Sequence, residues 1–255
     1  NSKNNVLMEC EYKYSLQDRE TGNLYRDMFP YSEVPKCTFN FRLTPANPPE
    51  HIWITDTPFR DGQQSRAPYE PEQIVQLYKY LHKLGGPKGI IRQSEFFVYS
   101  ERDRKALRMC QELGPEIPGW IRASREDFKL ARDLGLRECG ILVICSDYHI
   151  YKKLKKTRRQ AVDGYLAVIK DALDAGIYPR CHFEDITRAD FYGFVVPFAH
   201  EISDLMAESG IPIKIRACDT MGYGVPYAGA SMPRSVPGIV YGLRNYGGFP
   251  AELLE

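Results

Sequence analysis

The segment ITDTPFRDGQQS, residues 54–65, places charged side chains directly after a short apolar run. Asp61 offers a carboxylate, the kind of ligand that suits Mg²⁺, Mn²⁺ and, together with histidines, Zn²⁺. Arg60 carries a permanent charge and forked donors, which could polarise a ketone or hold an oxyanion. The same spacing also fits a structural Arg–Asp pair at a strand end, so the segment alone leaves both interpretations open.

Two later strand candidates also mix apolar and titratable residues. Alternate residues of a strand share a face, so Gln93 lies beside Glu95, and His182 lies beside Glu184. A buried Glu95 needs a partner, and Arg60 is the nearest candidate in the predicted topology. Glu184 could orient a substrate or a metal-bound water. His182 could be a ligand, a hydrogen-bond donor or a satisfied core residue.

Polar residues end two further strand candidates. Ser146, Asp147 and His149 follow one of them, and Asp219 and Thr220 end the other. His149 could act on a carbonyl group, whereas Asp147 could cap the next segment. These positions extend the set of polar groups at strand ends.

Several familiar catalytic patterns are absent from the sequence. The five histidines form no H-x-H or H-E-x-x-H pair, so no two-histidine-plus-carboxylate metal site can be recognised locally. There is no G-x-S-x-G segment. Cys145, Cys181 and Cys218 lie in apolar segments that are predicted to be strands, which favours core packing over a nucleophilic role.

From residue 51 onward, apolar strand candidates alternate with helix-period segments. Such alternation predicts a parallel sheet with right-handed crossovers, either an open doubly wound sheet or a barrel. Polar groups spread over at least five strand ends favour a (β/α)8 TIM barrel, because an open sheet concentrates them at one switch point. The predicted strand and helix pairs are 51–55 with 70–85, 89–100 with a helix from Glu101, 117–123 with 125–136, 138–146 with 157–175, 177–185 with 191–209, and 211–220 with 235–246.

The length accommodates about six βα units. Each unit takes roughly 34 residues, near the length of a βαβ element, and two more would need roughly 70 further residues. We therefore expect residues 51–255 to be an N-terminal part of a barrel, with strands seven and eight beyond them. Residues 1–50 have prolines, tyrosines and no clear period. This segment is expected to be an irregular arm with a short strand at Thr38–Leu43 that packs on the main domain or a second subunit.

Composition limits the cellular context and the partners. Hydrophobic residues make up 43% and charged residues 26%, and the formal net charge is +1, which does not suggest a nucleic-acid partner. Seven irregularly spaced cysteines, with no signal peptide and no apolar run near ~20 residues, predict a cytoplasmic protein with reduced thiols and no membrane partner. The basic runs Arg102–Lys105 and Lys152–Arg159 could be solvated helix faces or a site for an anionic acyl-carrier tail.

Four motifs resemble one known superfamily. TDTPFRDGQQS resembles the strand-one motif D-T-T-[LF]-R-D-G-x-Q of the pyruvate-carboxyltransferase-like (HMG-CoA lyase-like) TIM barrels. SDYHIYKKLKKT is similar to its S-D-x-H-x-x-x-K-L segment, CHFEDITRAD to F-x-x-E-D-x-[TS]-R-x-D, and CDTMGYGVP to D-T-x-G-x-x-x-P. Together the motifs cover residues 54–226 in the right order, nearest the 2-isopropylmalate synthase and homocitrate synthase group.

The resemblance implies a divalent metal (Mg²⁺, Mn²⁺ or Zn²⁺) with Asp61 as a ligand, and Arg60 against a 2-oxo acid. It implies that the strand-two acid pairs with this arginine, where Glu95 fits and Gln93 is an alternative alignment. His182 falls where several relatives have serine. The residues that it implicates in catalysis are Arg60, Glu95, His149 and Glu184, and those that it implicates in substrate binding are Gln64, His182, Arg188 and Thr220.

The function implied is a metal-dependent condensation of acetyl-CoA with a 2-oxo acid, by a homodimer. The alternatives are a lyase or carboxyltransferase on the same barrel, or a non-catalytic relative. The segment GILVICSD lacks the lysine that the carboxyltransferases carry at strand four, which favours the synthases. Two departures stand out. Pro58 replaces a threonine of the motif, and the family's H-x-H metal pair would follow Glu255, so residues 1–255 alone are expected to bind metal poorly and to be inactive.

Overall fold

The computed structural model describes residues 37–39, 42–44, 50–114, 117–227 and 229–255. The chain divides into two units, residues 1–36 and 37–255, and all described residues belong to the second. Most of the predicted arm, including its tyrosines, lies outside the described residues. The single strand predicted at Thr38–Leu43 is instead two strands, because β1 (Cys37–Phe39) and β2 (Arg42–Thr44) pair with each other in antiparallel register.

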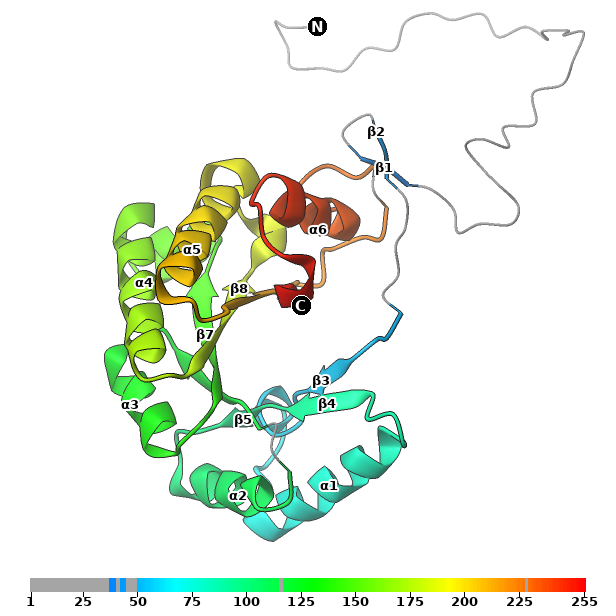
Figure 1. Ribbon diagram of the computed structural model, residues 1–255, viewed down its shortest axis with the longest axis vertical. Coiled ribbons are helices and arrows are strands. Elements are labelled where there is room, and N and C mark those ends of the chain that lie inside the picture. The colour runs from blue at the N-terminus through cyan, green and yellow to red at the C-terminus, as the bar shows by residue number, and fades with distance from the viewer. Residues whose placement is uncertain (1–36, 40–41, 45–49, 115–116, 228) are drawn as a thin grey trace, which may run out of the picture. The chain divides into compact units, whose positions relative to one another are not determined.

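The parallel strands follow one another in chain order around a curved sheet (Figure 1). The first pairs with the second through β3 and β4, and the remaining pairs run from β5 to β9. Only Glu95 separates β4 from β5, so these two segments form one bent strand position. This unbroken order is that of a barrel, which confirms the predicted fold. The strands are β3 (Ile54–Asp56), β4 (Ile91–Ser94), β5 (Phe96–Phe97), β6 (Gly119–Arg122), β7 (Glu138–Ile144), β8 (Tyr178–Glu184) and β9 (Lys214–Ala217).

The helices lie along the outer side of these strands, and each packs on the next in chain order for most of the series (Figure 1). Four of them begin after a residue whose hydroxyl accepts a hydrogen bond from a backbone N–H of the first turn, as N-caps do. These N-caps are Ser100, Ser124, Thr157 and Ser235. The helices are α1 (Pro71–Leu84), α2 (Glu101–Gln111), α3 (Arg125–Asp133), α4 (Arg158–Asp174), α5 (Val196–Ser209) and α6 (Val236–Asn245).

The two faces of the sheet differ in chemistry. Strand β8 turns Cys181 and Phe183 toward the helices, where Phe183 stacks on Phe198 of α5 with ring centroids 5.2 Å apart. The alternate residues Arg180 and His182 are also buried, but they face charged side chains of other strands. The apolar core therefore lies between strands and helices, and the interior of the barrel is polar.

The last two residues of the chain pair with β9. Leu254 forms a parallel bridge with Ile215, and the Glu255 N–H donates to the Ile215 carbonyl at 2.8 Å. The Ala217 N–H donates to the Glu255 carbonyl at 2.8 Å. Leu254 and Glu255 thus occupy the position of a seventh parallel strand. Within the described part of the chain, no helix has the length and apolar character needed to cross a membrane.

Candidate active site

The loop after β3 carries the first two site residues on a tight turn. A short 3-10 helix, Asp61–Gln64, begins immediately after Arg60. The Gln63 amide fixes this turn, because its Nε2 donates to the Phe59 carbonyl at 2.9 Å and its Oε1 accepts from the Tyr69 N–H at 3.1 Å. The predicted binding residue Gln64 is exposed on the same helix. Gln63 is therefore the structural glutamine, and Gln64 is the one that faces solvent.

The Arg60 guanidinium is held on three sides. Its Nε donates to Glu95 Oε2, its Nη1 donates to Asp61 Oδ1 at 2.8 Å, and it lies 5.1 Å from the Trp120 ring centroid. Among the described residues, no side chain pairs with Nη2. The pairing of Arg60 with Glu95 confirms the prediction from topology, and the arginine keeps both N–H groups of Nη2 for a ligand.

Glu95 is completely buried at the centre of a charged layer. Its Oε1 lies 3.2 Å from His182 Nε2 and 3.4 Å from Arg216 Nη1. Burial alone would raise the pKa of this carboxyl. His182, Arg60 and Arg216 lower it by more than burial raises it, and the net result is a pKa of about 2. Glu95 is therefore an ionised anchor for Arg60 and no proton donor at neutral pH.

The alternative alignment, in which Gln93 would pair with Arg60, is wrong. Gln93 Oε1 accepts instead from Arg180 Nη2, and Gln93 Nε2 lies 3.5 Å from the carboxylate of Glu138. Gln93 lies two residues nearer the amino end of its strand position than Glu95, which puts it in a lower layer of the barrel.

A glycine in β7 makes room for this layer. A Cβ on Gly140 would lie 2.8 Å from His182 Nε2, 3.1 Å from Glu95 Oε1 and 3.1 Å from Trp120 Cδ1. Real Cβ atoms almost never approach a heavy atom at 2.8 Å, so any side chain here would displace the histidine. The sequence offered no reason to single out Gly140.

His149 and Glu184 face each other at the next two strand ends. His149 Nδ1 lies 3.7 Å from Glu184 Oε2, too far for a hydrogen bond. Both atoms are buried and neither has a hydrogen-bond partner among the described residues. A buried polar pair at this separation suits a ligand oxygen or a water that bridges the two groups. The pairing of predicted site residues 35 positions apart in sequence is the feature that most resembles a binding site.

The remaining predicted residues support a strained turn after β8. Asp185 adopts the left-handed region at φ 61°, where its N–H donates to Thr220 Oγ1 at 2.9 Å. Arg188 donates to the Asp185 carboxylate from Nε and Nη2, and its guanidinium lies 4.5 Å from the Tyr148 ring centroid. Thr220 and Arg188 thus hold the loop that follows Glu184.

Burial raises the pKa of Cys218, which follows β9, to about 12, although the charges of Arg216 and Arg60 lower it. Burial also raises the pKa of Cys145 and of Cys181, as expected for core cysteines. The five described cysteines are free thiols.

A second carboxylate at this end of the strands is partly buried. Asp56 ends β3, and its Oδ2 accepts a hydrogen bond from Ser94 Oγ, while its Oδ1 is buried without a partner among the described residues. Burial is the main reason that the pKa of Asp56 rises to about 6.

The residues described here do not by themselves form a metal centre. They contain no group of three or more His, Cys, Asp or Glu side chains that could hold an ion. Asp61 could supply one oxygen, since its side chain is 51% exposed and its Oδ1 is shared with Arg60. The donor set present is thus one carboxylate at the rim, which fits part of a divalent-metal site.

Some expectations for the rim were wrong and some useful residues were missed. Asp147 does not cap the following helix, because Arg158 binds its carboxylate through Nε and Nη2 at 2.9 and 2.6 Å. Arg180 and Arg216 were overlooked, although the period of two in β8 and β9 places Arg180 with His182 and Lys214 with Arg216. That alternation was the available signal.

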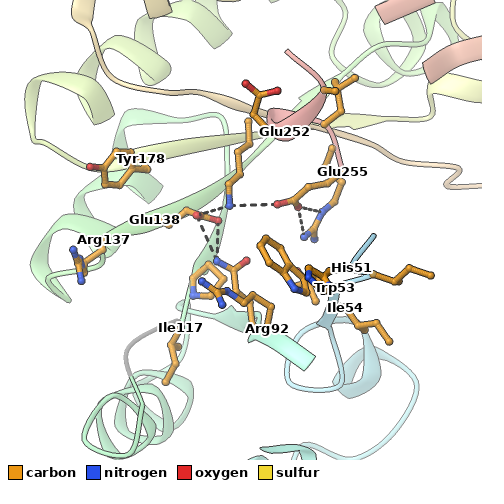
Figure 2. Close-up of a pocket in the computed structure, with 18 residues that line it drawn as sticks. His51, Trp53, Ile54, Arg92, Ile117, Arg137, Glu138, Tyr178, Glu252 and Glu255 are labelled. Atoms are coloured by element: carbon orange, nitrogen blue, oxygen red, sulfur yellow. Dashed lines mark hydrogen bonds and ion pairs between the residues drawn. The ribbon is translucent and has the colours of Figure 1, made fainter. Parts of the chain in front are cut away.

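A cavity lies at the opposite end of the strands. It has a volume of about 1020 Å³ and is lined by residues at the amino ends of β3, β4, β6, β7, β8 and β9. Figure 2 shows Trp53 and Arg92 on one side of it, with Glu138 and Tyr178 on another and Glu255 above. None of the predicted catalytic residues lines it.

Comparisons with known proteins identify the family to which the chain is similar. A family described as HMGL-like matches residues 51–237. A citrate (Re)-synthase from Clostridium kluyveri is 54% identical over 98% of this chain and 56% of its own length, and one from Syntrophus aciditrophicus is 56% identical over 96% of this chain and 39% of its own. A 2-phosphinomethylmalate synthase from Streptomyces hygroscopicus is 34% identical over 94% of the chain and 56% of its own length. The chain spans about half the length, or less, of these relatives.

Solved structures show the same fold. An HMG-CoA lyase from Brucella melitensis superposes with a TM-score of 0.56 at 16% identity, covering 81% of this chain and 71% of that one. One from Pseudomonas aeruginosa gives a TM-score of 0.56 at 15% identity, covering 82% and 68%. At these identities the likeness concerns the fold alone.

Proposed function

This chain belongs to the HMGL-like family, and we propose that its protein condenses acetyl-CoA with a 2-oxo acid, with oxaloacetate as the acceptor. The choice of acceptor rests on the relatives at 54% and 56% identity, which are citrate (Re)-synthases. The observation that carries the proposal is the Arg60 guanidinium, which Glu95 and Asp61 hold through Nε and Nη1, so that both N–H groups of Nη2 are left for a ligand. A 2-oxo acid presents carboxylate and ketone oxygens that such a donor can bind.

Arg60 binds the 2-oxo acid and stabilises the alkoxide that forms from its ketone. In the reaction, a base removes a proton from the acetyl methyl group, the resulting carbanion attacks the ketone carbon, and a new C–C bond forms. The alkoxide then takes up a proton, and water hydrolyses the thioester to a carboxylate and free CoA. Because Arg60 is already fixed before the charge develops, it pays no reorganisation cost in the transition state.

His149 and Glu184 act on the other oxygens of the reactants. Their facing atoms, 3.7 Å apart and without hydrogen-bond partners, suit a ligand oxygen placed between them. Gln64 and Thr220 complete the rim in this proposal, while Arg188 holds the loop through Asp185.

A divalent cation is part of the proposal through Asp61, which would supply one of its ligands. When bound, such an ion would polarise the ketone and stabilise negative charge on its oxygen. The proposal also includes a homodimer in the cytoplasm, as the sequence analysis predicts.

The test is release of free CoA thiol by the full-length protein. Acetyl-CoA with oxaloacetate should release thiol, and pyruvate, 2-oxoglutarate and 2-oxoisovalerate should release it more slowly. Thiol release with another acid would retain the class and correct the acceptor. No release with any acid, together with cleavage of a hydroxyacyl-CoA, would replace the synthase by a lyase.

A further inference from the structure

We propose that His182 is a positioning residue, whose imidazole holds the Glu95 carboxylate in the orientation from which it fixes the Arg60 guanidinium. This inference rests on the proposed function, because it concerns the arginine that binds the 2-oxo acid there. His182 does not reach the rim itself, so it acts through Glu95 and not by contact with substrate.

The contact between His182 and Glu95 is buried. His182 is 2% exposed, and its Nε2 lies 3.2 Å from Glu95 Oε1. Nε2 makes no well-aligned hydrogen bond with any described residue, and Glu95 Oε1 is the oxygen that it contacts. A bare lone pair on Nε2 would point at a negative oxygen, so the nitrogen carries its hydrogen toward Glu95. Burial lowers the pKa of the imidazole, and the Glu95 carboxylate opposes this shift.

Each carboxylate oxygen of Glu95 has a different task. Oε2 accepts from Arg60, whereas Oε1 faces His182 and two cations. Arg216, which is level with His182 in the strand register, donates to Oε1 from Nη1 at 3.4 Å, and Arg180 Nη1 lies 3.7 Å away. Arg180 lies two residues nearer the amino end of β8 than His182. Without the imidazole, only cations remain on Oε1, and Arg180 draws the carboxylate toward the amino end and away from Arg60.

The neighbouring chain is built around this contact. A Cβ on Gly140 would lie 2.8 Å from His182 Nε2 and 3.1 Å from Glu95 Oε1. Trp120 closes the same space, 3.1 Å from that position, and also supports the Arg60 guanidinium. An interior that merely needed filling would accept a methyl group at residue 140. Here the space is reserved for the imidazole and the carboxylate.

The experiment compares three substitutions in the full-length protein. His182→Leu removes the donor, His182→Gln keeps an N–H near the position of the imidazole Nε2, and Cys181→Ala alters the same strand on its outward face. We expect His182→Leu to lower kcat/KM for the 2-oxo acid at least tenfold while the KM for acetyl-CoA stays within about twofold. His182→Gln should recover most of that loss. Cys181→Ala should lower stability in urea and leave both kinetic constants unchanged.

Two further measurements keep the proposal falsifiable. In an Arg60→Lys background, His182→Leu should have little additional effect, because the two residues act through one contact. Gly140→Ala should reproduce the kinetic pattern of His182→Leu by displacing the imidazole. Equal losses in the presence and absence of Arg60, a loss in Cys181→Ala as large as that in His182→Leu, or wild-type kinetics in His182→Leu would each overturn the assignment.

A crystal structure of His182→Leu separates this inference from the proposed function. The Arg60 Nε to Glu95 Oε2 contact should be broken or replaced. If wild-type protein releases no thiol with any 2-oxo acid, the proposed function fails, but the contact can still be inspected. If the contact is unchanged in the variant, the positioning role fails whatever the reaction is.

Discussion

The two ends of the barrel strands are both charged, but they use charge differently. At the amino end, Arg180 and Lys214 both pair with the carboxylates of Glu138 and Glu255 around the 1020 Å³ cavity. At the carboxyl end, His149 Nδ1 and Glu184 Oε2 face each other without hydrogen bonds. The unpartnered nitrogens of Arg180 lie beside the carboxylates of Glu95 and Glu255, whereas His149 and Glu184 are two predicted site residues that face each other. The proposed site and the 1020 Å³ cavity therefore lie at opposite ends of the strands.

The largest expected effect is the loss of Arg60 at the carboxyl end. Arg60→Ala should lower kcat by about 10²- to 10³-fold, because a fixed donor to a developing oxyanion is removed. Thiol release at saturating acetyl-CoA measures it. Arg125→Ala is the matched control, since Arg125 donates to Asp171 at 2.8 Å in an exposed ion pair and should leave kcat unchanged. An equal fall in kcat for Arg60→Ala and Arg125→Ala would contradict a specific role for Arg60 in the reaction.

A carboxylate at the amino end should affect stability and not rate. Glu138→Gln removes a negative charge that pairs with the fully buried Arg180 guanidinium. The loss of this ion pair should lower the free energy of unfolding by about 3 kcal/mol. Urea unfolding gives this value, and kcat should stay within about twofold of wild type. Glu201→Gln, which breaks an ion pair with the exposed Arg159, is the control and should change neither quantity. A large fall in kcat for Glu138→Gln would show that the amino end takes part in the reaction.

Asp56, at the carboxyl end of β3, should make the free energy of unfolding depend on pH. Its pKa is about 6 in the folded protein and about 3.8 in the unfolded chain, so the folded state alone keeps the proton between these values. The stabilisation is therefore full below pH ~4 and disappears as pH rises through 6, by an amount on the order of 3 kcal/mol. Asp56→Asn should remove this fall. The measurement is the difference in unfolding free energy between wild type and variant from pH 4 to 7, and a flat difference would contradict the assignment.

The smallest expected effect concerns the basic run on the rim. Lys152, Lys153, Lys155 and Lys156 are exposed, and no ion pair engages them among the described residues. Replacing all four with glutamine should raise the KM for acetyl-CoA about three- to tenfold at low salt, because they attract its phosphates. The KM for acetyl-pantetheine, which lacks the nucleotide, should not change. An equal rise for both thioesters would assign the lysines to another role.

The sequence predicted the barrel order because strand and helix periods are local. It also placed Glu95 against Arg60, since topology brings neighbouring strand ends together. It could not predict which inward residues would be buried, so His182 was grouped with rim residues although it lies beneath them. Gly140 and Arg216 were missed for a related reason, because their importance comes from contacts made across the interior.

The most direct test of the account is a crystal structure of the full-length protein with a bound 2-oxo acid. We predict density for its carboxylate or ketone within hydrogen-bond distance of Arg60 Nη2, with another oxygen between His149 and Glu184. Density for the acid in the amino-end cavity, near Lys214 and Glu255, with Arg60 unchanged and unoccupied, would contradict it.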